Sequence, residues 1–232
     1  MRLEIADLTL RRDDVLRLSV PEMHSDVTGV FAILGHNGAG KSLFLRMVHG
    51  ILAPDSGQIT WDGVAASQSR RRRGFMFQSP PRLRRSVADN VAFPLLAQGM
   101  SGKDAKARVA DALAAHGLAE LAAQPAATLS GGEAQRMALA RALVTGPDVV
   151  LMDEPCANLD PAATRLVEDT IRRIVAGGVA VLISTHDLAQ ARRLATDVVL
   201  FDQGHVAFHG TADAFFADTG NRIAENFKAG YL

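Results

Sequence analysis

The stretch that decides the fold is GVFAILGHNGAGKS, residues 29–42. Its first six residues, 29–34, are an apolar run and predict a buried strand that ends at a glycine-rich turn. From Lys41 to Leu52 the apolar residues recur at helical spacing, and Pro54 predicts the end of that helix. Glycines let the backbone of the turn curl so that amide hydrogens point at an anion, and the helix offers its positive N-terminal end. The stretch therefore predicts a phosphate-binding loop between a strand and a helix.

The loop itself, GHNGAGKS at residues 35–42, fits the pattern Gly, four residues, Gly-Lys-Ser. In that pattern Lys41 supplies a mobile charge for the β- and γ-phosphates of a nucleotide, and Ser42 supplies a hydroxyl for Mg²⁺. The alternative is an ordinary glycine-rich turn, which the predicted strand and helix on either side disfavour. The residues that we expect to bind nucleotide are Gly35, His36, Asn37, Gly38, Ala39, Gly40, Lys41, Ser42 and Leu43.

A pair of acids follows a second apolar run. The run VVLM, residues 149–152, leads straight into Asp153 and Glu154. In phosphate-loop enzymes an Asp at the end of such a strand holds Mg²⁺, directly or through water. A carboxylate at the next position, close to the γ-phosphate, can orient or deprotonate the attacking water. The alternative is a solvated turn, which the phosphate loop in the same chain disfavours.

A second candidate anion site is LSGGE, residues 129–133. Ser130 is a good N-cap and Glu133 lies three residues on, so the simplest interpretation is a capped helix. The Ser-Gly-Gly turn also exposes amides at a positive helix end, which is a second design for binding phosphate. Two such sites in one chain either bind different phosphates or serve a nucleotide held between two chains.

The rest of the chain alternates between strand and helix patterns. Strands are predicted at 2–10, 15–20, 58–61, 74–78, 179–184, 198–201 and 206–208, with a helix from Pro161 and short helices within the Ala-rich stretch 84–123. This order predicts an α/β fold: a phosphate-loop NTPase core, whose sheet is mainly parallel with an antiparallel β part, plus a helical subdomain. We expect a single domain over 1–232, with its core at about 1–78 and 147–232 and the helical subdomain at about 79–146.

Composition narrows the class of protein. Among 232 residues, 25 Lys and Arg balance 25 Asp and Glu, which argues against a dedicated nucleic-acid binder. A single cysteine, Cys156, fits a reducing compartment, and the N-terminus has no signal-peptide core. No apolar run reaches the length of a membrane span, so we expect a soluble, cytosolic chain. The charge block 70–73, four arginines, is interpreted as a solvated turn, with binding of acidic headgroups or a partner as the alternative.

The order of the motifs along the chain resembles the nucleotide-binding subunit of ATP-binding-cassette (ABC) transporters, and the resemblance covers essentially all of the chain. Its most specific part is the serine-glycine-glycine signature followed by Gln-Arg and an Ala/Leu helix, since many NTPases share the phosphate loop. The motifs are GHNGAGKS (35–42), Gln78, LSGGE with AQRMALARAL (129–143), VVLMDEP (149–155), ANLD (157–160) and STHD (184–187).

The resemblance implies a head-to-tail homodimer with two ATP molecules at its interface. By that likeness the signature of one subunit, Ser130, Gly131 and Gly132 followed by Glu133, contacts the γ-phosphate held by the other subunit. Asp160 crosses the interface.

The resemblance also implies roles in catalysis. Glu154 is the general base, His186 hydrogen-bonds the γ-phosphate and aligns the water, and Gln78 senses Mg²⁺ and the water. Ser42, Gln78 and Asp153 are the expected ligands of Mg²⁺, the cofactor that accompanies ATP.

Three positions depart from the family pattern. Leu43 stands where a Thr hydroxyl is usual near the α-phosphate, and Cys156 stands where Thr is typical, either as a small buried residue or as an oxidation-sensitive thiol. The aromatic residue on which the family stacks adenine is missing, since the first aromatic of the chain is Phe31. The planar guanidinium of Arg12 or Arg11 is the candidate replacement.

No membrane span is fused to the motifs, which favours a stand-alone subunit that docks on a separate permease, as in prokaryotic importers. Residues 77–87, with 90–91 and 94–95, resemble the surface that receives the permease, and residues 45–63 add to a likeness with oxyanion importers, tungstate importers in particular. We therefore expect a peripheral protein on the inner face of the cell membrane, served indirectly by a solute-binding protein. The alternatives are a scaffold that binds ATP but hardly hydrolyses it, and a soluble ABC ATPase of repair or translation.

Overall fold

The computed structural model describes residues 1–157, 159–217 and 219–231, so Asn158 of the ANLD motif lies outside the described residues. Within these ranges ten strands form one sheet, flanked by eight α-helices. The strands are β1 (Arg2–Arg12), β2 (Val15–Asp26), β3 (Val30–Leu34), β4 (Ser56–Trp61), β5 (Val64–Ala65), β6 (Arg73–Met76), β7 (Val149–Asp153), β8 (Ala180–Ser184), β9 (Asp197–Asp202) and β10 (His205–Thr211). The helices are α1 (Lys41–His49), α2 (Val87–Ala97), α3 (Gly102–Ala115), α4 (Gly131–Leu143), α5 (Pro161–Ala176), α6 (Leu188–Leu194), α7 (Ala212–Phe216) and α8 (Arg222–Ala229).

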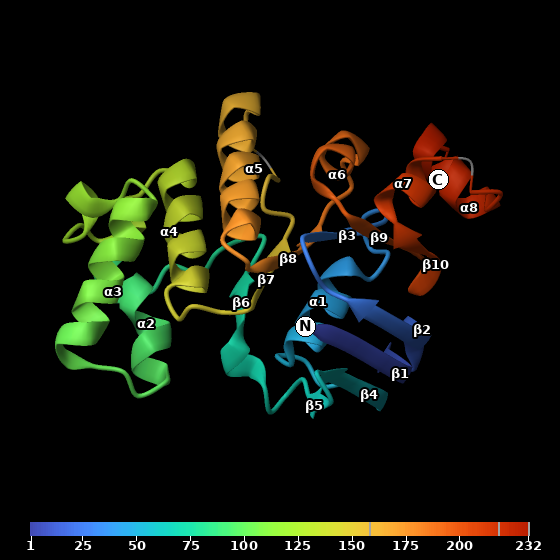
Figure 1. Ribbon diagram of the computed structural model, residues 1–232, viewed down its shortest axis with the longest axis horizontal. Coiled ribbons are helices and arrows are strands. Elements are labelled where there is room, and N and C mark those ends of the chain that lie inside the picture. The colour runs from blue at the N-terminus through green and yellow to red at the C-terminus, as the bar shows by residue number, and fades with distance from the viewer. Residues whose placement is uncertain (158, 218, 232) are drawn as a thin grey trace.

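The sheet has a parallel part and an antiparallel part, in the order β5-β4-β1-β2-β10-β9-β3-β8-β7-β6. The strands from β9 to β6 run parallel, whereas β1, β2, β4 and β5 pair antiparallel. β10 pairs antiparallel with β9 and meets β2 at a single bridge. The predicted α/β phosphate-loop NTPase fold is thus confirmed, and Figure 1 shows the antiparallel strands beside the N-terminus.

Burial follows the sequence pattern of each part. β3, β7 and β8 are buried at every position, as expected for central parallel strands covered on both faces. β1 alternates between buried and more accessible positions, because only one of its faces packs on the core. One hydrophobic cluster includes Phe44 and Trp61 under the antiparallel part, and a second includes Ile171 and Phe227 on the other side of the parallel strands.

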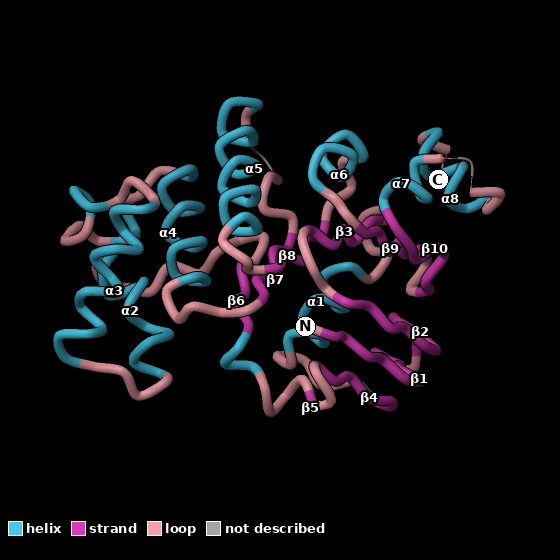
Figure 2. The backbone as a smooth tube through the Cα atoms, viewed as in Figure 1, coloured by secondary structure: helices cyan, strands magenta, loops and turns pink. Residues whose placement is uncertain are grey.

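The helices α2, α3 and α4 share a third hydrophobic cluster of their own, which includes Val91, Leu113 and Met137. Figures 1 and 2 show these helices at the opposite end of the molecule from β1 and β2. α4 also contacts the sheet, since a Cβ built on Gly74 of β6 would lie 2.2 Å from the carbonyl oxygen of Ala142. A glycine at this position allows the helix and the strand to approach closely.

Most strands are longer than the sequence predicts, β2 above all, which continues to Asp26 instead of residue 20, whereas α1 and β6 end early. α1 ends at His49 instead of Leu52, because Gly50 adopts a left-handed conformation (φ 92°) and its N–H donates to the carbonyls of Arg46 and Met47. β6 ends at Met76, so Gln78 lies in the loop after the strand.

The arginine block is only partly solvated. Residues 70–72 form a short 3₁₀ turn, but Arg73 is 4% exposed and its guanidinium donates to Ser69 Oγ and to the carbonyls of His49 and Ala66. It also lies over the Trp61 ring, 5.3 Å from the centroid. The interpretation as a solvated turn is therefore wrong for Arg73, because a charge count does not reveal that the last arginine enters the strand. No helix among the described residues is long and apolar enough to cross a membrane.

Candidate functional site

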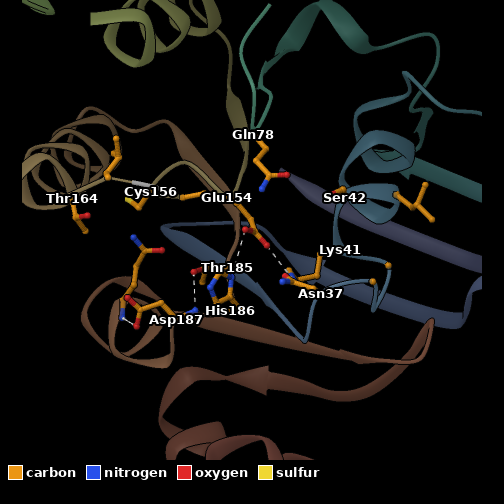
Figure 3. Close-up of a pocket in the computed structure, with 16 residues that line it drawn as sticks. Asn37, Lys41, Ser42, Gln78, Glu154, Cys156, Thr164, Thr185, His186 and Asp187 are labelled. Atoms are coloured by element: carbon orange, nitrogen blue, oxygen red, sulfur yellow. Dashed lines mark hydrogen bonds and ion pairs between the residues drawn. The ribbon is translucent and has the colours of Figure 1, made fainter. Parts of the chain in front are cut away.

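A cavity of about 700 Å³ opens at the carboxyl ends of the parallel strands β3, β6, β7 and β8 (Figure 3). In open parallel sheets this edge is where ligands bind, because the loops that leave the strands meet there. The cavity is lined by Asn37, Gly38, Gly40, Lys41, Ser42, Leu43, Gln78, Glu154, Cys156, Ala157, Leu159, Thr164, Thr185, His186, Asp187 and Gln190.

The phosphate loop connects β3 to α1, as predicted. Gly35, Gly38 and Gly40 all have positive φ, the conformation that favours glycine. A Cβ on Gly35 would lie 2.4 Å from the Phe201 carbonyl oxygen, whereas a Cβ on Gly38 would meet nothing within 4 Å. The first glycine is therefore required by packing, and Gly38 leaves the cavity side of the loop open.

Lys41 spans the loop from the start of α1. Its Nζ donates to the carbonyl oxygens of Gly35 (2.8 Å) and His36 (3.0 Å) and lies 3.3 Å from Glu154 Oε1. The ammonium group is held against the loop by two of its carbonyls and lines the cavity, so a polyphosphate in the cavity would meet it. The His36 ring lies outside the cavity and packs edge-on against Phe227 of α8, with 4.9 Å between the ring centroids.

Asp153 is completely buried beneath the loop. Its Oδ1 accepts hydrogen bonds from Ser42 Oγ and Ser184 Oγ, both at 2.8 Å. Its Oδ2 is buried without a hydrogen-bond partner and lies 4.0 Å from the Arg46 guanidinium. The Asp153 carboxylate and the Ser42 hydroxyl are hard oxygen donors in direct contact, and they suit a cation such as Mg²⁺, which takes one or two protein ligands together with phosphate oxygens.

Glu154 extends into the cavity from a strained backbone. Its φ is 44°, in the left-handed region, and its N–H donates to Ser184 Oγ at 2.9 Å. Its Oε2 lies 3.5 Å from Nδ1 of His186, which is largely exposed. Figure 3 shows the Glu154 carboxylate between Lys41 and His186. Strain at a residue with a carboxylate in a cleft is typical of functional sites.

The signature residues lie elsewhere. Ser130 caps α4, its hydroxyl and its N–H both donate to Glu133 Oε2, and these bonds hold the pKa of Glu133 below its usual value. None of residues 130–133 lines the cavity, and no side chain or backbone lies within 4 Å of a Cβ built on Gly131 or Gly132. The predicted capping box is thus present, and the Ser-Gly-Gly turn faces open space.

Asp160, Arg11 and Arg12 also lie outside the cavity lining. Asp160 caps α5, accepting hydrogen bonds from the N–H groups of Ala162 and Ala163. Arg12 is about half exposed, donates to the carbonyl of Arg11 and lies 4.0 Å from Asp55. The cavity thus brings together six residues of the loop with Gln78, Glu154 and His186, and Asp153 lies behind it in contact with Ser42. The predicted residues that do not line it are Gly35, His36, Ala39, Asp153, the signature, Asp160, Arg11 and Arg12.

A sequence model of the ABC transporter family matches residues 23–157, more than half of the chain. This chain belongs to the ABC transporter family. It is an ATP-binding subunit, and its family membership makes it an ATPase.

Individual relatives of this ABC ATPase have several cargoes. It is 36% identical to "Phosphate import ATP-binding protein PstB 2" of Natronomonas pharaonis, over 87% of this chain and 77% of that one. It is 35% identical to "Tungstate uptake system ATP-binding protein TupC" of Peptoclostridium acidaminophilum, over 93% of this chain and 100% of that one. Other relatives are named for cobalt or methionine import. A solved "ATP binding subunit of ABC transporter" superposes with a TM-score of 0.85 at 25% identity, covering 100% of this chain and 99% of that one.

Sequence reasoning missed several residues of the ABC ATPase cavity. Leu159, Thr164, Thr185, Asp187 and Gln190 line it without having been given a role, although Leu159, Thr185 and Asp187 lie within the motifs ANLD and STHD. Asp187 carried a usable signal, because an Asp just before a helix is a good N-cap, and it caps α6 with its Oδ1. Thr164 and Gln190 belong to none of the motifs.

Cys156 lines the ATP cavity from the loop after Glu154. Burial raises the pKa of its thiol to about 11. A thiol in that state is almost entirely protonated at neutral pH, which favours an unreactive side chain over the reactive thiol, although Cys156 is half-buried and not fully buried.

Proposed function

We propose that this chain powers an ABC importer, by hydrolysing ATP between two copies of itself on the inner face of the cell membrane. The observation that carries the proposal is the convergence of Lys41, Glu154 and His186 on one cavity, with Asp153 buried directly behind Ser42 of its lining, although these residues come from three segments of the chain. This set contains a phosphate-binding cation, a ligand for a divalent cation, a base and a hydrogen-bonding imidazole.

Each residue has a role in that reaction. Lys41 and the amides of residues 35–43 bind the phosphates. Glu154 accepts the proton of the attacking water, and His186 holds the γ-phosphate and the water in line with it. Ser42 and Asp153, with Gln78 at the cavity wall, hold Mg²⁺, which neutralises charge on the phosphates when it is bound.

A second copy of the chain completes each site. No atom lies within 4 Å of a Cβ built on Gly131 or Gly132, so the start of α4 is open next to Ser130, whose own N–H is bonded to Glu133. This open turn supports a γ-phosphate contact in the partner subunit. Glu133 holds the turn through the capping box, and Asp160 contacts the partner. Core residues of about 1–78 and 147–232 then carry the phosphate loop, and the helical subdomain of about 79–146 carries the signature.

A separate permease docks on the surface around residues 77–87. The structure refines the residues involved, because Asn90, Val91 and Leu95 are buried within the helical part. Asn90 holds the loop from inside, accepting from Leu83 N–H and donating to Leu83 O and Ser86 O. The side chains that are available for contact on α2 are Phe93 and Leu96, which are 47% and 50% exposed.

The cargo that we propose is an oxyanion such as tungstate, delivered to the permease by a solute-binding protein. The likeness to the tungstate uptake protein over its full length supports this choice, and the likeness to the phosphate importer is consistent with the same chemical class. In cells that lack this chain, tungstate uptake is expected to fall and to recover with the intact chain but not with Glu154→Gln. Loss of cobalt or methionine uptake in place of tungstate uptake would contradict this cargo.

Glu154→Gln tests the ATPase mechanism itself. With the base removed, hydrolysis should fall by about 10²- to 10⁴-fold while ATP and Mg²⁺ convert the chain to a stable dimer. Steady-state hydrolysis and size-exclusion chromatography measure the two effects, with Glu120→Gln on the helical part as the control. Unchanged turnover would contradict the role of the base, and a strictly monomeric chain at high concentration would contradict the shared site.

A further inference from the structure

Glu168 of α5 and Arg193 of α6 form a two-pronged ion pair behind the ATP cavity. Arg193 Nε donates to Glu168 Oε2 at 3.0 Å, and its Nη2 donates to Oε1 at 2.6 Å. The Glu168 side chain is only 3% exposed, so its charge depends on this guanidinium. Two parallel hydrogen bonds fix both the distance and the relative orientation of the groups that they join. The pair therefore fastens α5 to α6 at one defined point.

Both helices begin at the wall of the cavity and lie next to each other (Figure 1). α5 starts after its cap Asp160, and α6 starts after its cap Asp187, which directly follows His186. Glu168 lies eight residues after Asp160 and Arg193 lies seven residues after His186. Because Thr164 of α5 and Gln190 of α6 still line the cavity, the pair lies about one helical turn beyond it on each helix.

α6 has few other attachments. It is seven residues long, and its buried side chains are Gln190, Ala191 and Leu194. A helix this short is not stable by itself, so contacts with its neighbours decide where its first residue points. Among the described residues, two of these contacts involve a charged group: the Arg193 ion pair with α5, and the Arg192 guanidinium, which lies over the Phe216 ring of α7 at 5.0 Å from its centroid.

We propose that Glu168 and Arg193 are positioning residues for catalysis: by locking α6 against α5, they hold His186 at its distance from Glu154. This inference rests on the proposed function, because His186 matters only if the chain hydrolyses ATP there. The same ion pair connects α6, which follows His186, to α5, which follows Asp160. It therefore also connects the imidazole to the segment that we expect at the subunit interface. Buried ion pairs are weak evidence for stability but can fix a conformation, and that is the effect assigned here.

The test replaces the pair by methionines, Glu168→Met with Arg193→Met, which removes both charges and keeps apolar packing. Hydrolysis should fall at least about 10-fold in kcat, while ATP affinity changes less than about 2-fold, because neither residue lines the cavity. The matched control is Arg172→Met. Arg172 lies 3.7 Å from the same carboxylate but stays on α5 and pairs with Asp169, so its loss should leave kcat unchanged.

A merely structural role is separated by a double-mutant cycle with His186→Ala. If the pair acts through His186, adding the two methionines to the His186→Ala chain should reduce kcat by less than about 2-fold further. The proposal would be overturned if the two methionines lowered kcat by the same factor with His186 present and in the His186→Ala chain. It would also be overturned if the pair variant kept the kcat of the unsubstituted chain. If the double variant does not fold, Arg193→Lys serves in its place, because it keeps the charge but loses the two-pronged geometry. It should lower kcat by a smaller factor than the double variant and again leave ATP affinity nearly unchanged.

Amide hydrogen exchange provides a readout that does not need hydrolysis. The N–H groups of Ala189 and Gln190, which donate to the Asp187 cap, should exchange at least about 10-fold faster in the pair variant and unchanged in Arg172→Met. If these amides exchanged at the same rate in the pair variant as in the unsubstituted chain, the proposal that the ion pair holds α6 against α5 would be overturned, whether or not the chain hydrolyses ATP. Failure of the unsubstituted chain to hydrolyse ATP, with the exchange result as expected, would instead count against the proposed function alone.

Discussion

Lys41 Nζ lies 3.3 Å from Glu154 Oε1, and both side chains are largely buried. The phosphate-binding cation and the candidate base are therefore direct neighbours at the wall of one cavity. The opposite oxygen of the same carboxylate faces His186. A polyphosphate that binds Lys41 is consequently brought beside the base and the imidazole by the same contact.

Lys41→Ala should weaken ATP binding on the order of 100-fold, because the charge-assisted hydrogen bonds from Nζ to the phosphates are lost. Titration with a fluorescent ATP analogue measures the change. Lys103→Ala, on an exposed part of α3, is the control and should leave affinity as it was. Tight ATP binding by Lys41→Ala would contradict the assignment of the phosphate loop.

Asp153→Asn should raise the Mg²⁺ concentration needed for half-maximal hydrolysis on the order of 10-fold. The amide keeps the shape of the side chain but removes the negative charge that the cation requires. A Mg²⁺ titration of hydrolysis gives the result, with thermal unfolding to verify the fold. The control is Asp148→Asn, an exposed carboxylate paired with Arg72. A folded Asp153→Asn chain with the original Mg²⁺ requirement would show that the carboxylate is not a ligand.

The sequence predicted the parallel strands and the site residues on them because each signal is local. β3 and β7 are unbroken apolar runs, and Lys41, Asp153 and Glu154 follow such runs at fixed spacing. The resemblance to a family added His186 and Gln78, which no local physical pattern would have selected.

What the sequence did not predict depends on tertiary contacts. The burial of Arg73 results from three carbonyl and hydroxyl acceptors that come from α1 and the segment after β5. The early end of α1 depends on the glycine conformation at Gly50, and Leu159 reaches the cavity through loop geometry alone. No periodic pattern of residues in the sequence predicts any of these features.

Stability should fall as the pH drops from about 6.5 to about 4. Burial lowers the pKa of His49 from 6.5 to about 4. Between these values the unfolded chain binds a proton at His49 that the folded chain does not, so protonation favours unfolding. The expected loss from this residue is roughly 3 kcal/mol at the acidic end.

Urea unfolding at pH 7 and pH 4 checks this expectation, with His49→Gln as the matched variant. Gln keeps a donor for the Arg73 carbonyl but does not titrate. The difference between the two chains in free energy of unfolding should therefore move by roughly 3 kcal/mol between the two pH values. Identical pH dependence in both chains would show that His49 is not the titrating group.

Cys156 should react slowly with alkylating agents in the folded protein. With a pKa of about 11, its thiolate fraction at pH 8 is on the order of 100-fold below that of a free thiol. Iodoacetamide labelling followed by mass spectrometry should show a rate that rises about tenfold for each pH unit between pH 8 and pH 10. The same thiol in urea is the control, and fast labelling of the folded chain at pH 8 would revive the oxidation-sensitive interpretation.

Base selectivity should be weak if an arginine takes the place of the aromatic residue that the family stacks on adenine. If the Arg12 guanidinium stacks on the base, ATP and GTP should bind within about 5-fold of each other, and Arg12→Ala should weaken both by about 2- to 5-fold, as expected for an exposed cation–π contact. Competition binding measures both nucleotides, with Arg11→Ala as the neighbouring comparison and Arg2→Ala, at the other end of β1, as the control. A strong preference for ATP that survives both Arg11→Ala and Arg12→Ala would mean that the adenine contact comes from another part of the molecule.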